Sequence, residues 1–161
     1  MREYNREKTV EYAKKWAYSR NPNYYNFDSV GGDCTSFVSQ CIYAGSRVMN
    51  YNKQNGWYYI NGNNKSPSWS GVNFLYNFLI QNKGVGPHGI KSNQDGIKLG
   101  DIVQLSFDGI KFEHSVVIVR IENTLDLSGI FIAAHTNDAY NRQLSSYGAS
   151  LLRFVHITDV L

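Results

Sequence analysis

A cysteine near the start of a helix is the residue of this sequence best suited to chemistry. Gly31 and Gly32 free the backbone for a sharp turn, and Asp33 is expected to cap the following helix by accepting from its first backbone N–H groups. Cys34 then occupies the first turn, where unpaired N–H groups and the helix dipole favour an anion. Because a thiolate is a far stronger nucleophile than a thiol, this position predicts nucleophilic catalysis.

The second cysteine lies on the same predicted helix. Cys34 and Cys41 are separated by a rise of roughly 10 Å if both are helical. A disulfide needs Cα atoms about 4.4–6.8 Å apart, so both are expected to be free thiols. Cys41 shares the apolar face of the helix with Phe37 and Val38, and we interpret it as a small buried hydrophobic residue.

A cysteine nucleophile needs a base within hydrogen-bond reach, and that base needs an orienting partner. The chain has four histidines, of which His88 follows a proline in a glycine-rich stretch and is expected on the surface. His114 begins a predicted strand, His135 closes the next one, and His156 lies in the last. A single histidine is most simply a structural or surface residue. Three on consecutive strands favour a site, because adjacent antiparallel strands can place His114 and His135 side by side.

The first half of the chain carries the helical period that would position Cys34. Apolar residues recur there at spacings of three and four, which is typical of helices with one buried face. Gly45 is expected to end the helix of Cys34, because glycine readily adopts the left-handed conformation that closes a helix. The pattern predicts helices at about residues 5–19, 34–44 and 72–79.

After residue 100 the apolar period changes to two, which predicts strands. His114 shares one face with Phe112 and Val116, whereas Val117 lies on the other, so both faces are expected to be covered. Strands are predicted at residues 101–105, 112–121, 130–135 and 152–157. Helices first and an antiparallel sheet second predict a single α+β domain over residues 1–161, in which the N-terminal helices, including that of Cys34, pack on the sheet.

The segment between the second and third predicted helices has no sustained period. Residues 49–66 are rich in Asn, Tyr and Gly, and we expect a long surface loop, which in a compact domain is often functional. Trp57, Tyr58 and, just beyond the loop, Trp69 are candidate substrate-contacting rings. The favoured alternative is that these rings simply cover the core.

Composition limits the classes of function. With 42% hydrophobic residues the chain is not expected to be disordered, and its net charge of +3 includes no basic block that would indicate nucleic-acid binding. No apolar run is long enough for a membrane span, and the first residues do not form a signal peptide. Aromatic residues make up 14% of the chain, which is common on extracellular or carbohydrate-contacting surfaces. We expect a monomer that is secreted or cell-wall-associated if the chain is part of a longer one.

Four motifs resemble those of papain-like cysteine peptidases of the NlpC/P60 type. Residues 33–38 resemble the cysteine signature, residues 99–105 a Gly-Asp strand, residues 114–119 the base strand and residues 132–135 the strand of the third polar residue. The motifs span nearly the whole chain, and their order is similar to that in the putative amidase domain family of bacterial extracellular proteins. This family is related to NlpC/P60 and CHAP domains. The resemblance implies a papain-like fold.

The resemblance also implies roles for individual residues. Cys34 would be the nucleophile, His114 the general base and acid, and His135 the residue that orients the His114 ring. Asn137 and Asp138 are rivals for that third role, since papain-like enzymes often use Asn or Asp. The backbone N–H of Cys34 is the candidate oxyanion donor. The implied reaction is hydrolysis of an amide bond through a thioester, in peptides or peptidoglycan stem peptides, without cofactor or metal.

Two other classes of function compete with the hydrolase. The first is a non-catalytic module on the same fold that binds a glycan or peptide through its aromatic residues. The second is a zinc site made from His114, His135 and either Cys34 or His156. Closely spaced ligand pairs such as His-x-x-x-His or Cys-x-x-Cys are absent, which argues against the metal site.

Overall fold

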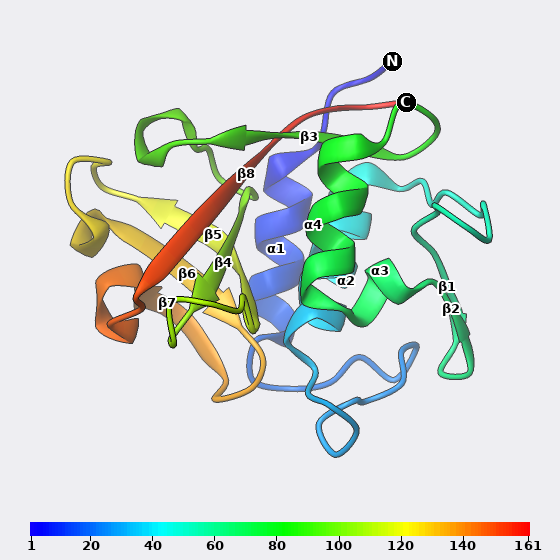
Figure 1. Ribbon diagram of the computed structural model, residues 1–161, viewed down its shortest axis with the longest axis horizontal. Coiled ribbons are helices and arrows are strands. Elements are labelled where there is room, and N and C mark those ends of the chain that lie inside the picture. The colour runs from blue at the N-terminus through cyan, green and yellow to red at the C-terminus, as the bar shows by residue number, and fades with distance from the viewer.

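A helical layer and a six-stranded antiparallel sheet make up the molecule (Figure 1). The computed structural model describes residues 1–161, and its architecture is α+β, as predicted. The helices are α1 (Arg6–Trp16), α2 (Cys34–Ser46), α3 (Pro67–Ser70) and α4 (Val72–Gln81). Short 3-10 turns lie at η1 (Gln94–Gly96), η2 (Leu127–Gly129) and η3 (Leu144–Tyr147).

The sheet has the strand order β3-β8-β4-β5-β6-β7. Its strands are β3 (Pro87–Ser92), β4 (Ile102–Ser106), β5 (His114–Ile121), β6 (Ile130–Ala134), β7 (Ala139–Gln143) and β8 (Leu151–Val160). The long C-terminal strand β8 therefore lies inside the sheet, between β3 and β4. A separate hairpin joins β1 (Tyr59–Asn61) to β2 (Asn64–Lys65).

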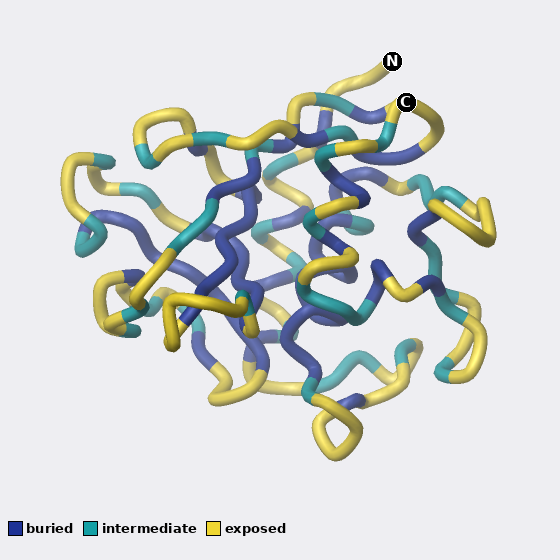
Figure 2. The backbone as a smooth tube through the Cα atoms, in the orientation of Figure 1, coloured by how far each residue is buried: buried dark blue, intermediate teal, exposed yellow.

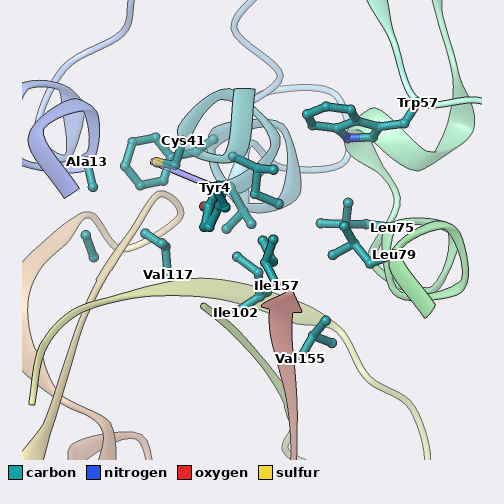
Figure 3. Packing of buried hydrophobic residues seen from close by; sticks show 14 of the residues in the cluster. Tyr4, Ala13, Cys41, Trp57, Leu75, Leu79, Ile102, Val117, Val155 and Ile157 are labelled. Atoms are coloured by element: carbon teal, nitrogen blue, oxygen red, sulfur yellow. The ribbon is translucent and has the colours of Figure 1, made fainter. Parts of the chain in front are cut away.

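Both faces of the sheet are covered, as the alternation of β5 predicts. Val117 belongs to the larger core cluster, which the helices complete with residues such as Cys41 and Leu75 (Figure 3). Val116 and Ile118 belong to a smaller cluster on the opposite face. The central strands accordingly run through buried backbone, and exposure concentrates in the loops (Figure 2).

The predicted end of the Cys34 helix at Gly45 is wrong. The helix continues to Ser46, and Arg47, with φ 60°, adopts the left-handed conformation that closes it. Gly45 instead serves packing, because a Cβ atom there would lie 2.6 Å from the carbonyl oxygen of Asn5 and would also clash with the side chain of Thr9. A glycine at this position lets α2 approach the start of α1 closely.

Other elements differ from the prediction. The predicted loop over 49–66 contains the β1–β2 hairpin, and the short helix α3 precedes the predicted third helix, which is confirmed as α4. His88, expected in a surface loop, lies in β3, where its ring nitrogens contact Gly84 O (2.7 Å) and Asp159 Oδ1 (3.0 Å). The strands β3 and β7, at the two edges of the sheet, were not predicted, because neither alternates clearly between apolar and polar residues.

The tryptophans proposed as substrate contacts are core residues. Trp57 and Trp69 are both fully buried, with ring centroids 5.0 Å apart, and Trp57 Nε1 donates to Ser39 Oγ (3.0 Å). Tyr58 is half-buried beside Tyr51, with ring centroids 5.8 Å apart. The alternative interpretation, in which these rings cover the core, therefore fits the two tryptophans.

Candidate active site

A buried hydrogen bond between α2 and β5 brings the cysteine and histidine motifs together. The hydroxyl oxygens of Thr35 and Ser115 are 2.9 Å apart, and Gln104 Nε2 on β4 donates to Ser115 Oγ (3.1 Å). Thr35 follows Cys34 in the chain and Ser115 follows His114. The bond therefore places the nucleophile and base candidates at the same end of the sheet, although no hydrogen bond joins their side chains in this structure.

Cys34 is the first residue of α2 and is 9% exposed. No side chain caps this helix start, so its first backbone N–H groups have no side-chain acceptor. Such N–H groups, together with the helix dipole, favour negative charge at the end of the helix. The position therefore combines a thiol with donors suited to an anion.

His114 is the first residue of β5, is 7% exposed and has no hydrogen-bond partner for its ring. Burial, which disfavours the imidazolium, and the positive charge of Arg142 together lower the pKa of His114 from 6.5 to about 4. The ring is therefore neutral at pH 7. A neutral imidazole is the form that can accept a proton from a thiol.

Tyr147 lies beside His114 and within electrostatic range of Cys34, and it was missed in the sequence. Its ring centroid is 5.7 Å from that of His114, and the Arg142 guanidinium carbon lies 3.7 Å from the Tyr147 ring centroid. Burial raises the pKa of Tyr147, Arg142 opposes this, and the charge of a Cys34 thiolate would raise it further. The Tyr147 hydroxyl is buried without a hydrogen-bond partner, which is uncommon for such a group. The hydroxyl therefore has a free donor hydrogen in the region of the two candidates.

His135 has other partners than the expected one. Its Nδ1 lies 2.6 Å from Asp33 Oδ2 and its Nε2 lies 2.7 Å from Trp16 O, and the ring stacks on Phe37 with centroids 3.9 Å apart. Both ring nitrogens are therefore engaged, one by a carboxylate and one by a backbone carbonyl. Neither nitrogen remains for the ring of His114.

The register of β5 and β6 explains why these two histidines do not meet. Val117 pairs with Ala133, and both belong to the core on the helix side. By strand alternation His135 shares the face of Ala133, whereas His114 shares the opposite face with Val116. His114 begins β5, whereas His135, predicted to close β6, lies in the turn directly after it, and the two side chains face different sides of the sheet.

Asp33 does not cap α2, and this expectation is wrong. Its Oδ1 accepts from the backbone N–H of Phe27 (2.9 Å), while Oδ2 faces His135. Both Asp33 and His135 are 1% exposed. The carboxylate thus fixes the glycine turn before Cys34 to the end of β6, and its negative charge is directed to His135.

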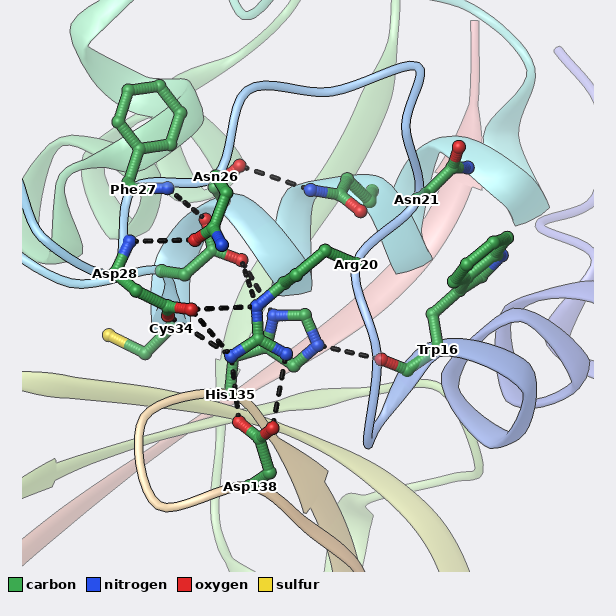
Figure 4. A network of polar contacts seen from close by, with 12 residues as sticks. Trp16, Arg20, Asn21, Asn26, Phe27, Asp28, Cys34, His135 and Asp138 are labelled. Carbon is green, nitrogen blue, oxygen red and sulfur yellow. Dashed lines mark hydrogen bonds and ion pairs between the residues drawn. The ribbon is translucent and has the colours of Figure 1, made fainter.

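Arg20 completes this network at the surface (Figure 4). Its guanidinium donates to both carboxylate oxygens of Asp28 (3.1 Å each) and of Asp138 (2.9 and 3.1 Å). Asp138, a rival third residue, is therefore engaged with Arg20. Asn137, the other rival, lies in the turn after β6 with φ 58° and makes no side-chain hydrogen bond.

The remaining thiol and histidine lie outside this region. Cys41 is fully buried and burial raises its thiol pKa well above the ordinary value, and neither cysteine forms a disulfide, as predicted. His156 Nδ1 contacts Asp101 Oδ2 (2.7 Å), which also accepts from Lys98 N. The structure gathers no three His, Cys, Asp or Glu side chains in a metal-binding arrangement. The zinc hypothesis therefore has no geometric support.

The comparisons with known proteins agree over almost the whole chain. The profile of a family described as "Putative amidase domain" matches residues 3–157. The chain is 32% identical over 168 residues to a protein of Bacillus subtilis (strain 168) named "Uncharacterized protein YhbB", covering 98% of this chain and 51% of that protein. The chain thus spans about half the length of this relative. No solved structure matches. None of the helices has the length and apolar character needed to cross a membrane.

Proposed function

Since this chain belongs to the family described as "Putative amidase domain", we propose that it is a cysteine hydrolase that cleaves amide or peptide bonds. The observation that carries the cysteine mechanism is the Thr35–Ser115 hydrogen bond, which holds the helix start of Cys34 beside the strand start of His114. The motifs around both residues resemble those of papain-like enzymes of the NlpC/P60 and CHAP type.

The proposed reaction begins when His114 accepts the proton of the Cys34 thiol. The sulfur attacks the amide carbonyl carbon, and the resulting oxyanion accepts from the backbone N–H of Cys34 and from the hydroxyl of Tyr147. His114 then gives its proton to the leaving amine, which leaves a thioester on Cys34. Water, activated by His114, hydrolyses the thioester to a carboxylic acid and restores the thiol.

Substrate binding completes the geometry in this proposal. The free structure has no hydrogen bond between Cys34 and His114, and catalytic hydrogen bonds often tighten only in the substrate complex. At pH 7 the His114 ring is neutral, which is the form that can accept the proton of the thiol.

His135 takes a positioning role in place of the role predicted for it. A free carboxylate next to Cys34 would oppose formation of the thiolate. The contact with His135 engages Oδ2 of the Asp33 carboxylate, so this carboxylate is not free. Asp138 holds Arg20 against the same loop. Neither His135 nor Asp138 therefore acts on His114 directly.

The substrate that we propose is a peptide, with the stem peptides of peptidoglycan as the first candidate. This follows the motif resemblance, as does the proposed secreted or cell-wall-associated location. The competing hypothesis of a binding module has lost Trp57 and Trp69 as ligand contacts, because both are fully buried.

Digestion of purified peptidoglycan and of a peptide library tests the proposal. Mass spectrometry should detect new amine and carboxylate termini with the unaltered chain and none with Cys34→Ala. Cys41→Ala is the matched control, because this thiol is buried on the same helix and has no role in the reaction. Cleavage that survives Cys34→Ala in a correctly folded protein would contradict the proposal.

A further inference from the structure

A concave surface lies along the exposed side of α4. A groove of about 590 Å³ runs between α4, residues 50–56 and the turn at 82–84. Five asparagines and two glutamines line it, no acidic residue does, and Lys83 is its one charged side chain. It shares no residue with the Cys34 site, so it calls for a separate explanation.

The walls of the groove are fixed by hydrogen bonds within the chain. The carbonyl oxygen of Val85 accepts from both Asn50 Nδ2 and Asn82 Nδ2, each at 3.0 Å. Ser68 Oγ donates to Gly56 O at 2.7 Å, which ties the start of α3 to the opposite loop. A groove held in shape before binding loses little conformational freedom when a ligand arrives.

Other amides of the groove have no partner in the chain. Asn77 and Gln81 are exposed, make no side-chain hydrogen bond and lie one turn apart on α4. Gln54 and Asn55 use only their backbone N–H groups, both donated to Asn52. Each free amide offers one acceptor oxygen and two donor hydrogens to a ligand.

An apolar surface accompanies these amides. Phe74 precedes Asn77 and Gln81 on the same face of α4, at helical spacing, and its ring is 60% exposed. Phe78, between them in the chain, is 6% exposed and belongs to the core beneath the groove. The groove therefore combines a flat ring with several donors and acceptors.

We propose that this groove binds an uncharged oligosaccharide. Sugar hydroxyl and N-acetyl groups both donate and accept, which matches amide side chains, and the C–H face of a pyranose ring can pack on Phe74. The absence of carboxylates and the single lysine give no basis for recognising a charged ligand. This inference does not depend on the proposed hydrolysis.

An extended peptide fits the same surface less well. Peptides are commonly bound by pairing with a free strand edge or by filling apolar pockets. The walls here are helices and loops, and the hydrophobic lining is limited to two residues, Phe74 and Phe78. The observations therefore favour the sugar.

Titration with chitotetraose, cellotetraose and maltotetraose, followed by calorimetry and by amide NMR shifts, tests this site. At least one should bind, with shifts concentrated at residues 50–56 and 74–84. The double variant Asn77→Ala/Gln81→Ala should raise the Kd by about tenfold or more. Alanine is a good helix former, so both changes should preserve α4. Phe74→Ala should weaken binding similarly.

Asn64→Ala is the matched control, because this exposed amide lies in the β1–β2 hairpin outside the groove. This variant should bind the sugar with an unchanged Kd. The proposal is overturned if none of the three sugars binds at millimolar concentration, or if binding survives both groove variants. A neutral tetrapeptide that binds the groove more tightly than every sugar would also overturn it. The titration measures no turnover, so its outcome is separate from that of the amide-cleavage test.

Discussion

At the scale of single residues, the low pKa of His114 makes stability depend on pH. Its pKa is about 4 in the folded chain and 6.5 in its ordinary state, so only the unfolded chain gains a proton between these values. The free energy of unfolding should therefore fall as pH drops from 6.5 through 4, by about 3 kcal/mol. Above pH 6.5 neither state is protonated and the effect vanishes.

Urea denaturation at pH 7 and pH 4 measures this effect when His114→Gln is compared with the unaltered chain. The variant lacks the titrating group, whereas every carboxylate is retained in both proteins. Its loss of stability on acidification should be smaller by about 3 kcal/mol. Equal losses in the two proteins would show that His114 keeps an ordinary pKa in the fold.

The unpartnered hydroxyl of Tyr147 supports a second prediction. Tyr147→Phe should reduce kcat for amide cleavage by about 10²-fold, as expected for loss of one oxyanion donor. It should leave stability unchanged or slightly increased, because the removed group is buried and makes no hydrogen bond.

Activity and urea denaturation must be measured on the same Tyr147→Phe preparation. Tyr140→Phe, on the adjacent strand β7, is the control and should keep full activity. A structural role for Tyr147 would instead appear as lost stability with unchanged activity.

Residue-level prediction succeeded where local sequence decides the outcome. The start of a helix at Cys34 and the place of His114 close to the start of a strand followed from the glycine turn and the alternation around them, although the strand begins at residue 114 and was predicted from 112. The partner of His135 could not be predicted from local sequence, because it depends on which face of the sheet each strand presents to α2. Tyr147 lies after an edge strand in a segment without a regular period, so no local signal marked it.

At the scale of elements, Gly45 gives a test of how α1 and α2 pack. Gly45→Ala should destabilise the chain by about 1–3 kcal/mol, although alanine favours a helix, because the new methyl group would overlap Asn5 and Thr9. Thermal or urea unfolding measures the change. Gly84→Ala is the control, because a Cβ there meets nothing nearer than 3.7 Å. A stabilised Gly45→Ala protein would refute this account of the packing.

The elements with strong periods were predictable, and the edges of the sheet were not. Central strands such as β4 and β5 are buried on both faces, so most of their residues are apolar and the strands stand out in the sequence. The edge strand β7 has one buried residue, Ala139, and is held mainly by backbone hydrogen bonds to β6. Backbone pairing leaves little trace in the choice of side chains.

At the scale of the whole molecule, the two proposed sites occupy different surfaces. The Cys34 region lies where the start of α2 meets β5 and η3, whereas the amide-lined groove lies along α4. The α+β class was predictable from helices preceding strands. The groove was not, because it is assembled from a loop and a helix face that carry no recognisable motif.

The Asp33–His135 contact has a consequence for how the chain matures. It joins residues 102 positions apart, and the Thr35–Ser115 bond joins residues 80 apart. Contacts between such distant residues carry a loop-closure cost in entropy and require both segments to have been synthesised. During synthesis Cys34 leaves the ribosome long before the strands that surround it. A nascent or truncated chain therefore carries the Cys34 thiol without the strands that surround it in the fold, and the amide cleavage that we propose would require those strands.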